Sequence, residues 1–169
     1  MTKTYIAEID NTATFDEFVF SAIPSFYKRL IIEGTLRSSV TGGSKWDQVH
    51  MYLNAETTPT NYHRQGMAYG NGGGFSTGET ADCNIAYITA DDSLANAFGS
   101  VRIVIEDYAG SNKKMMRGNF DFESTTDAVM TGQHAVTSDI TAAVTTITLQ
   151  ADDHPTHKLK GFLTLYGET

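Results

Sequence analysis

The side chains that could bind a metal ion are most concentrated near the C-terminal end of the chain. Asp152, Asp153, His154 and His157 supply two carboxylates and two imidazoles within one short segment. Divalent ions accept such ligands, but the spacing matches no established pattern such as His-Glu-x-x-His. Pro155 lies among them, and acidic polar residues around a proline are typical of a turn. We therefore expect a solvated turn between two strands, and no metal site.

A glycine-rich segment over residues 70–78 could cradle a phosphate with its backbone amides. The Gly-Lys-Ser/Thr ending of a phosphate loop is missing, and no helix-forming run follows to add its dipole. A flexible exposed loop is the simpler interpretation, and such loops often carry the variable contacts of surface modules. The candidate partner-binding loop therefore comprises Gly72, Gly73, Gly74 and Phe75.

Nucleophilic catalysis would have to use the single cysteine or a histidine. The candidate residues are Cys83, His50, His63 and His134. Asp82 precedes Cys83, and a neighbouring carboxylate raises the pKa of a thiol. The acid pair Asp91 and Asp92 is typical of a turn, since adjacent residues on a strand point to opposite sides. We expect no catalytic residue, no nucleophile elbow and no enzymatic activity.

Aromatic residues with a polar atom are the remaining candidates for ligand binding, because their rings could stack on sugars. They are Trp46, Tyr52, Tyr62, Tyr69 and Tyr87. Tyr and Trp are also ordinary residues of a β-sandwich, with the apolar body inward and the polar tip outward. We favour this second interpretation.

The elements that must position these residues are strands. The chain has 8 Tyr and 9 Phe and is rich in Thr, and these types suit a pleated, half-buried surface. Its 15 Gly against 3 Pro indicate turns built on positive-φ glycines. Apolar side chains alternate with other residues, with period 2, in several segments. These segments are 27–37, 49–53, 85–90, 101–106, 120–122, 144–149 and 159–166.

Segments of turn-forming residues separate the expected strands, and short helical turns are expected at 93–98 and 125–130. About seven or eight short strands separated by such turns predict an all-β fold. We expect a two-layer antiparallel β-sandwich of the jelly-roll type, formed as a single domain by residues 1–169.

The first twenty residues differ from the rest, because phenylalanines cluster there without regular alternation. Phe15, Phe18 and Phe20 lie close together in this segment. They either form a first edge strand that packs into the sandwich, or belong to an N-terminal arm (residues 1–20) that docks on a neighbouring subunit. Exposure of Phe15 in an isolated monomer would favour the arm.

The charge balance excludes several classes of partner. A net charge of −8 and a pI near 4.9 argue against general nucleic-acid binding and against an anionic membrane surface. The single cysteine rules out an intrachain disulfide and any multi-cysteine metal site. No apolar run is long enough to span a bilayer, and we expect no secretory signal at the N-terminus.

Two segments together resemble virion structural proteins of tailed bacteriophages. In the first, residues 23–30 read Ile-Pro-Ser-Phe-Tyr-Lys-Arg-Leu, similar to the family pattern Ile-Pro-x-x-Tyr-Lys-x-Leu, and an alternating strand follows. As in the family, Leu53-Asn54 and Asn61-Tyr62 come next. In the second, residues 143–149 and the closing Leu165-Tyr166-Gly167 resemble the last strands of the family. The chain departs from the pattern at Lys160-Gly161-Phe162, where the family often has Gly-Ser, and in continuing beyond Gly167.

The resemblance implies a virion protein without enzymatic activity or cofactor. We expect a head decoration (cement) protein, a homotrimeric jelly roll on the outer capsid surface that bridges subunits of the major capsid protein. It would be made in the host cytoplasm and would contact neither nucleic acid nor membrane. A tail-fibre, receptor-binding or tail assembly module that binds host glycans is the alternative, and a non-viral carbohydrate-binding domain is a more distant one.

The expected contacts between subunits are apolar residues near the N-terminus and cations that could pair with an acidic neighbour. They are Phe15, Phe18, Lys28, Arg29 and Arg37.

Overall fold

The computed structural model of the chain describes residues 2–70, 73–125, 128–152 and 154–169. These residues form twelve strands and one short 3₁₀ helix, η1 (Pro59–Asn61). The strands are β1 (Lys3–Asp10), β2 (Phe18–Phe20), β3 (Arg29–Ser38), β4 (Trp46–Leu53), β5 (Tyr62–Gly70), β6 (Gly73–Thr80), β7 (Asn84–Thr89), β8 (Gly99–Glu106), β9 (Lys114–Thr125), β10 (Ala128–Ser138), β11 (Ile147–Ala151) and β12 (Leu159–Glu168).

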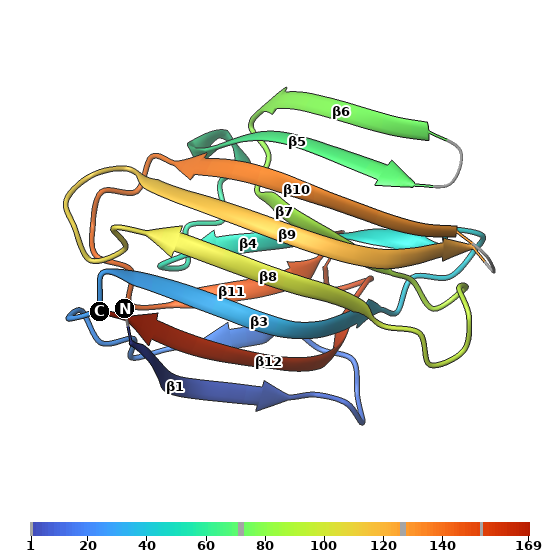
Figure 1. Cartoon of the computed structure of the whole chain (residues 1–169), viewed down its shortest axis with the longest axis horizontal. Helices are drawn as coiled ribbons and strands as arrows, with labels where there is room; N and C mark the ends of the chain where they lie inside the picture. Colours follow the sequence, from blue (N-terminus) through green and yellow to red (C-terminus); the bar gives the residue numbers. More distant parts are fainter. Residues whose placement is uncertain (1, 71–72, 126–127, 153) are drawn as a thin grey trace.

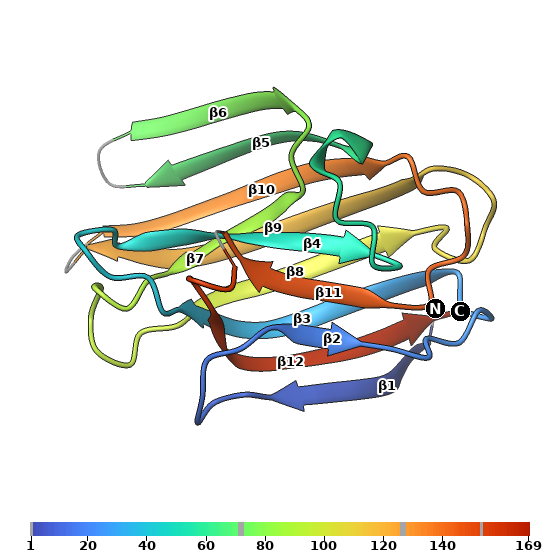
Figure 2. The ribbon, with the colours of Figure 1, turned by 180° about the vertical axis from the view of Figure 1, so that it is seen from behind.

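The strands are arranged in two layers (Figure 1). A large sheet has the order β1-β12-β3-β8-β9-β10-β5-β6, and a small sheet with the order β2-β11-β4-β7 lies behind it. Figure 2 shows the small sheet from its own side. Pairing within each layer is antiparallel, and a single parallel contact, Arg37 opposite Thr89, connects β3 with β7. The predicted two-layer, jelly-roll-like β-sandwich is therefore confirmed, with this parallel contact as an addition.

Buried and exposed side chains alternate along β5 and β8 of the large sheet, and the buried ones fill the space between the layers. On β8, Val101, Ile103 and Ile105 are buried, whereas Arg102 and Glu106 between and after them are exposed. Because successive side chains of a strand point to opposite faces, β8 contributes one row to the core and one row to the outside, and β5 alternates in the same way. Burial of these inward rows is the main favourable contribution to folding.

The N-terminal segment belongs to the sandwich in this chain. β1 pairs with β12 at the edge of the large sheet, and β2 pairs with β11 at the edge of the small sheet. Phe18 and Phe20 of β2 are buried in the core, at 0% and 2% exposure. These positions agree with the edge-strand interpretation of the segment.

Other expectations need correction. The segment expected as a helical turn at 93–98 forms hydrogen-bonded turns, and residues 128–130 belong to β10. The segment expected as a flexible loop at 70–78 contains most of β6, which pairs with β5 along its length. β1, β5, β6 and β10 were not predicted as strands. The described residues contain no helix of a length and apolarity that would let it cross a membrane.

The two chain termini lie side by side (Figures 1 and 2). Lys3 of β1 is opposite Glu168 of β12, and the Thr169 amide donates to the Thr2 carbonyl at 3.3 Å. Both ends therefore leave the sandwich at the same corner.

The two layers come very close where β7 crosses β9. A Cβ atom added to Gly118 of β9 would lie 2.0 Å from the carbonyl oxygen of Ile85 on β7. Ile85 is itself fully buried, and the obstacle is backbone, which cannot rotate away as a side chain can. Only glycine allows this approach of the sheets.

We therefore expect Gly118→Ala to lower the free energy of unfolding by at least about 2 kcal/mol, because overpacking against backbone forces the sheets apart. Gly78→Ala on β6 is the matched control, since its Cβ would meet no described atom within 4 Å. The control should change stability by less than about 0.5 kcal/mol. Urea denaturation of both variants measures the difference, and equal stabilities would contradict the close approach.

Candidate functional site

The face of the large sheet that points away from the small sheet carries the most chemically diverse exposed side chains. We call it the outer face. Its residues are the outward-pointing members of β1, β3, β5, β8, β9, β10 and β12, including Tyr5, Arg29, Glu33, Met67, Tyr69, Arg102, Val104, Glu106, Met115, Arg117, Asn119, Asp121, Val129, Thr131, Gln133 and Glu168.

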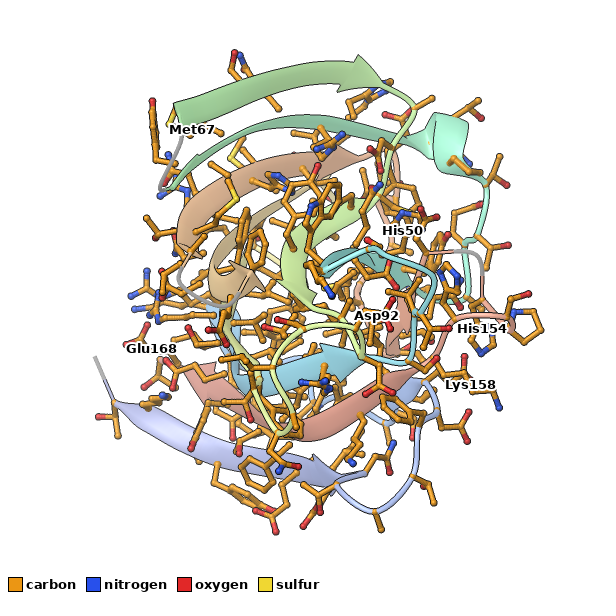
Figure 3. All side chains as sticks on the ribbon, turned by 90° about the vertical axis from the view of Figure 1, so that its right-hand side faces the viewer. His50, Met67, Asp92, His154, Lys158 and Glu168 are labelled. Carbon is orange, nitrogen blue, oxygen red and sulfur yellow. The ribbon has the colours of Figure 1, made fainter. Side chains whose placement is uncertain are left out.

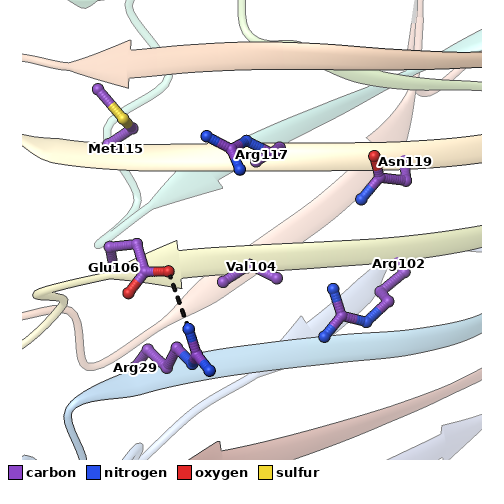
Figure 4. Close-up of a pocket in the computed structure, with 7 residues that line it drawn as sticks. All are labelled: Arg29, Arg102, Val104, Glu106, Met115, Arg117 and Asn119. Carbon is purple, nitrogen blue, oxygen red and sulfur yellow. Dashed lines mark hydrogen bonds and ion pairs between the residues drawn. The ribbon is translucent and has the colours of Figure 1, made fainter.

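Three arginines meet on neighbouring strands of the outer face (Figure 4). Arg29 of β3, Arg102 of β8 and Arg117 of β9 line a shallow depression of about 190 Å³. The cross-strand register brings them together, because Glu106 is opposite Arg29 and Val104 is opposite Arg117. The depression therefore joins cationic groups to the apolar side chains of Val104 and Met115.

Carboxylates within the chain neutralise two of these arginines. Arg29 pairs with Glu106 at 3.3 Å and donates to Glu168, which holds the pKa of the Glu168 carboxyl below its ordinary value. Arg102 pairs with Glu33 at 3.0 Å. Within residues 2–70, 73–125, 128–152 and 154–169, the guanidinium of Arg117 makes no hydrogen bond or ion pair, so it can bind an anionic partner.

A second depression, of about 300 Å³, continues the first across β9, β10 and β5. Asn119 belongs to both, and the second adds Asp121, Thr131, Gln133 and Tyr69. Tyr69 is 58% exposed. The outer face also exposes other large apolar side chains: Tyr5 of β1, Met67, Met115 and Val129.

The expected intersubunit contacts do not all lie on a free surface. Lys28 is exposed, and Arg29 lies on the outer face. Phe15 is half-buried, with the Lys160 ammonium 5.3 Å from its ring centre. Phe18 was wrongly placed in this group, because it is fully buried in the core and no partner can reach it.

Arg37 was also wrongly assigned to a subunit contact. It is 4% exposed, and its guanidinium pairs with Asp91 at 3.0 Å and donates to the carbonyls of Asp91, Leu94 and Ala97. These bonds hold the turns that follow β7.

The expected partner-binding loop lies mostly in β6. Gly72 is outside the described residues, as is the side chain of Phe75, while Gly73 and Gly74 begin the strand. Tyr69 of β5 is opposite Gly74, and a Cβ on that glycine would meet the tyrosine ring at 2.5 Å. The glycine thus makes room for the exposed tyrosine of the second depression.

Residues 74–78 also match a pattern that the sequence reasoning missed. They read Gly-Phe-Ser-Thr-Gly, the residue types of a hydrolase nucleophile elbow. That elbow needs its serine at a sharp strand-to-helix turn, whereas Ser76 lies within β6 opposite Met67. The extended backbone does not form an elbow.

The aromatic candidates for sugar stacking divide into two groups. Tyr52, Tyr62 and Tyr87 are buried, at 6%, 0% and 5% exposure, and belong to the core cluster. Trp46 and Tyr69 are exposed. The rings of the buried three are sandwich core residues, as the second interpretation expects, but the Tyr62 hydroxyl donates to the Glu56 carbonyl and does not point outward.

The structure brings together two candidates for catalysis that are distant in the sequence. His50 of β4 and Cys83, just before β7, place their ligand-type atoms within 4.8 Å of each other and of an Asp82 carboxylate oxygen. Burial raises the pKa of the Cys83 thiol to about 11. The thiol is therefore protonated at neutral pH, and the pair does not support a thiolate nucleophile.

The described side chains of the acidic turn at 152–157 do not converge on one point. Asp152 faces His50, with 3.7 Å between Oδ1 and Nε2, whereas His157 faces Asp47, with 3.6 Å between Nδ1 and Oδ2. Asp153 lies outside the described residues.

A buried polar network connects the two layers behind Asp82. Arg64 of β5 pairs with Asp82 at 2.7 Å and lies 3.5 Å from Nε2 of His134 on β10. The other ring nitrogen of His134, Nδ1, is 3.1 Å from the Asn84 carbonyl oxygen. Since a carbonyl only accepts, Nδ1 carries the proton and Nε2 accepts from Arg64. His134 is therefore neutral, and its burial, with the charge of Arg64, lowers its pKa to about 4.

No family model and no curated protein sequence matches this chain. Among solved structures, it is similar to the crystal structure of the Emp47p carbohydrate recognition domain, with 12% sequence identity and a TM-score of 0.32. The match covers 92% of this chain and 77% of that one. We infer no functional role for any residue of this chain from that similarity.

We expect the neutral state of His134 to make stability depend on pH. Its folded pKa of about 4 lies below the ordinary value near 6.5, so the unfolded chain binds the proton more tightly. The stability that comes from keeping His134 neutral is fully present above about pH 6.5 and is lost as the pH falls toward 4. Between pH 7 and pH 5, the free energy of unfolding should therefore fall by about 2 kcal/mol less in His134→Gln than in the wild type.

Urea denaturation at the two pH values measures this difference, with His63→Gln on the exposed side of β5 as the matched control. The control removes a histidine without touching the buried network. An NMR titration of the His134 ring in the wild-type protein gives an independent readout if the variant folds poorly. A ring that protonates near pH 6.5 would contradict the assignment.

Proposed function

We propose that this protein is a non-enzymatic structural protein of a tailed-bacteriophage virion that works by adhesion through its outer face. The observation that carries the proposal is the composition of that face. It combines exposed Met115, Val129 and Tyr69 with the cation of Arg117, on a chain of net charge −8. Exposed apolar side chains gathered on one face are typical of a surface that binds a partner.

The residue types of the outer face suit contact with another protein. Methionine adapts its shape to a partner, tyrosine adds a large ring with a hydrogen-bonding tip, and both types are enriched in interfaces. Arg117 can bind a carboxylate with two parallel hydrogen bonds. The expected partner surface is therefore partly apolar and carries acidic groups that complement Arg117.

The resemblance to phage structural proteins supports a place on the capsid. In this role the protein is a head decoration protein that, as a homotrimer, bridges subunits of the major capsid protein from outside. Many repeated weak contacts would then stabilise the head through multivalency. The net charge of −8 supports an outer position, because a protein lining the packaged DNA would be repelled by its phosphates.

A glycan-binding tail module is the second candidate, and the depression around Tyr69 favours it. The exposed tyrosine ring lies in one depression with the polar side chains of Asn119, Asp121, Thr131 and Gln133. Amide, carboxylate and hydroxyl groups beside an aromatic ring can bind sugar hydroxyls while the ring stacks on the sugar. Glycan-array binding that is lost in Tyr69→Ala would support this candidate.

For a head decoration protein, we expect hundreds of copies in each purified virion, because each major capsid cluster offers a site. Particles that lack the protein should release their DNA at a lower temperature and after milder osmotic shock. Quantitative gels and a DNA-release assay measure both effects, and added purified protein should restore the resistance. A few copies per particle, or unchanged resistance, would favour the tail module instead.

Attachment to depleted particles should depend on Arg117. We expect Arg117→Glu to weaken binding at least about tenfold, since the reversed charge meets acidic groups on the partner. Lys158→Glu changes the net charge equally but lies away from the outer face, which carries Met67 and Glu168 (Figure 3). This control should bind within about twofold of wild type. Equal loss of binding in both variants would show that overall charge, and not the outer face, governs attachment.

A further inference from the structure

A polar depression of about 280 Å³ lies on the side of the molecule opposite the outer face. Figure 3 shows His50 on this side, away from Met67 and Glu168. The residues that line it come from β4, from η1, from the segment before β7 and from the turn after β11. They are Gln48, His50, Pro59, Ala81, Asp82, Cys83 and Asp152.

We propose that this depression is a binding site for a divalent transition-metal ion of the zinc class, with His50, Asp82, Cys83 and Asp152 as ligands. One imidazole nitrogen, one sulfur and one carboxylate oxygen, from His50, Cys83 and Asp82, lie within 4.8 Å of one another. Asp152 approaches the same histidine from the turn after β11. The proposal is independent of the adhesive role of the outer face.

The spacing of the ligand atoms supports a tetrahedral metal site. His50 Nε2 and Asp152 Oδ1 are 3.7 Å apart, which is longer than a hydrogen bond. Ligand atoms on one tetrahedral zinc ion lie about 3.3 to 3.8 Å apart, because the bonds to nitrogen, oxygen and sulfur measure about 2.0 to 2.3 Å. The pair already has this separation. The atoms of His50, Asp82 and Cys83, which lie within 4.8 Å of one another, need to close by about 1 Å, and Asp152 has to turn toward them. Rotation of the His50 ring and of the Asp152 carboxylate, which is 39% exposed, can provide this closure while Asp82 keeps its hydrogen bonds.

The ligand types select the class of metal. Calcium and magnesium take oxygen ligands, whereas a site with one cysteine sulfur and one imidazole prefers zinc and related ions. The Cys83 thiol, protonated in the metal-free protein, would release its proton to solvent when the ion binds. Zinc also tolerates mixed nitrogen, oxygen and sulfur ligands in a four-coordinate arrangement. The set from β4, the β6–β7 connection and the β11–β12 turn meets that requirement.

Neighbouring residues hold two of the proposed ligands in place. Asp82 accepts from Arg64 at 2.7 Å and from the Asn84 amide at 2.7 Å, and ligating carboxylates are commonly fixed by such bonds. Cys83 interacts with the Tyr52 hydroxyl, which can donate to a metal-bound sulfur. Strand pairing fixes the histidine, because His50 is opposite Asn84 at a β-bulge, a feature common beside functional sites.

The test uses reduced full-length protein, stripped with a chelator and titrated with zinc chloride by calorimetry. We expect one zinc ion per chain and a melting temperature raised by about 5 to 10 °C at about 100 times the dissociation constant. Cobalt chloride gives a second readout, because a cobalt–thiolate bond produces a charge-transfer absorption band in the near ultraviolet. Absence of saturable binding at micromolar zinc would overturn the proposal.

Variants assign the ligands. Cys83→Ser should abolish the cobalt–thiolate band, and His50→Gln should weaken zinc binding more than about 100-fold. The matched control is the double variant His154→Gln, His157→Gln, which removes two histidines from the nearby turn and should bind zinc as wild type does. Zinc binding lost in the control, or retained with its cobalt band in Cys83→Ser, would overturn the assignment. Circular dichroism of the metal-free variants confirms that each one folds.

Discussion

The close approach of β9 to β7 is the constraint on which much of the molecule depends. Because Gly118 has no side chain, the Ile85 carbonyl can lie against β9, and all six residues of β7 are buried. That position brings Asn84 within hydrogen-bond distance of His134 and the preceding Asp82 to Arg64. One missing side chain thus sets both the thickness of the core and the place of the buried polar network, whose burial is favourable only because its members are paired.

The sequence predicted the strands whose inward row is apolar and missed those whose inward row is not. β8 alternates cleanly, and Leu30, Ile32 and Leu36 give β3 an apolar inward row, so period 2 was visible in both. The inward positions of β5 include Arg64 and Gly66, and those of β10 include Gly132, His134 and Ser138. These residues build the polar network and leave room for it, since a Cβ on Gly66 would meet the His134 ring at 2.0 Å. An alternation test cannot detect a strand that buries polar groups in pairs.

The candidate sites depend on pairing between strands that are distant in the sequence, which no local sequence pattern reveals. His50 and Cys83 were recognised as chemically capable residues, but only the β4–β7 register places them side by side. The outer face was likewise hidden, because Arg117 and Met115 become a surface only beside the strands that flank them. The sequence could not predict which cations are buried, and Arg37 is one of them because its guanidinium bonds to the turns after β7.

The adjacency of the chain ends has an architectural consequence. Anything fused at the Thr2 end or the Thr169 end emerges from one corner, where β1 and β12 run antiparallel. A short linker across that corner would close the backbone into a ring without crossing either face of the sandwich. New ends could then be opened at a hairpin on the opposite rim. The orientation in which the protein presents a cargo, or is itself presented on a larger scaffold, can thus be chosen without altering its core.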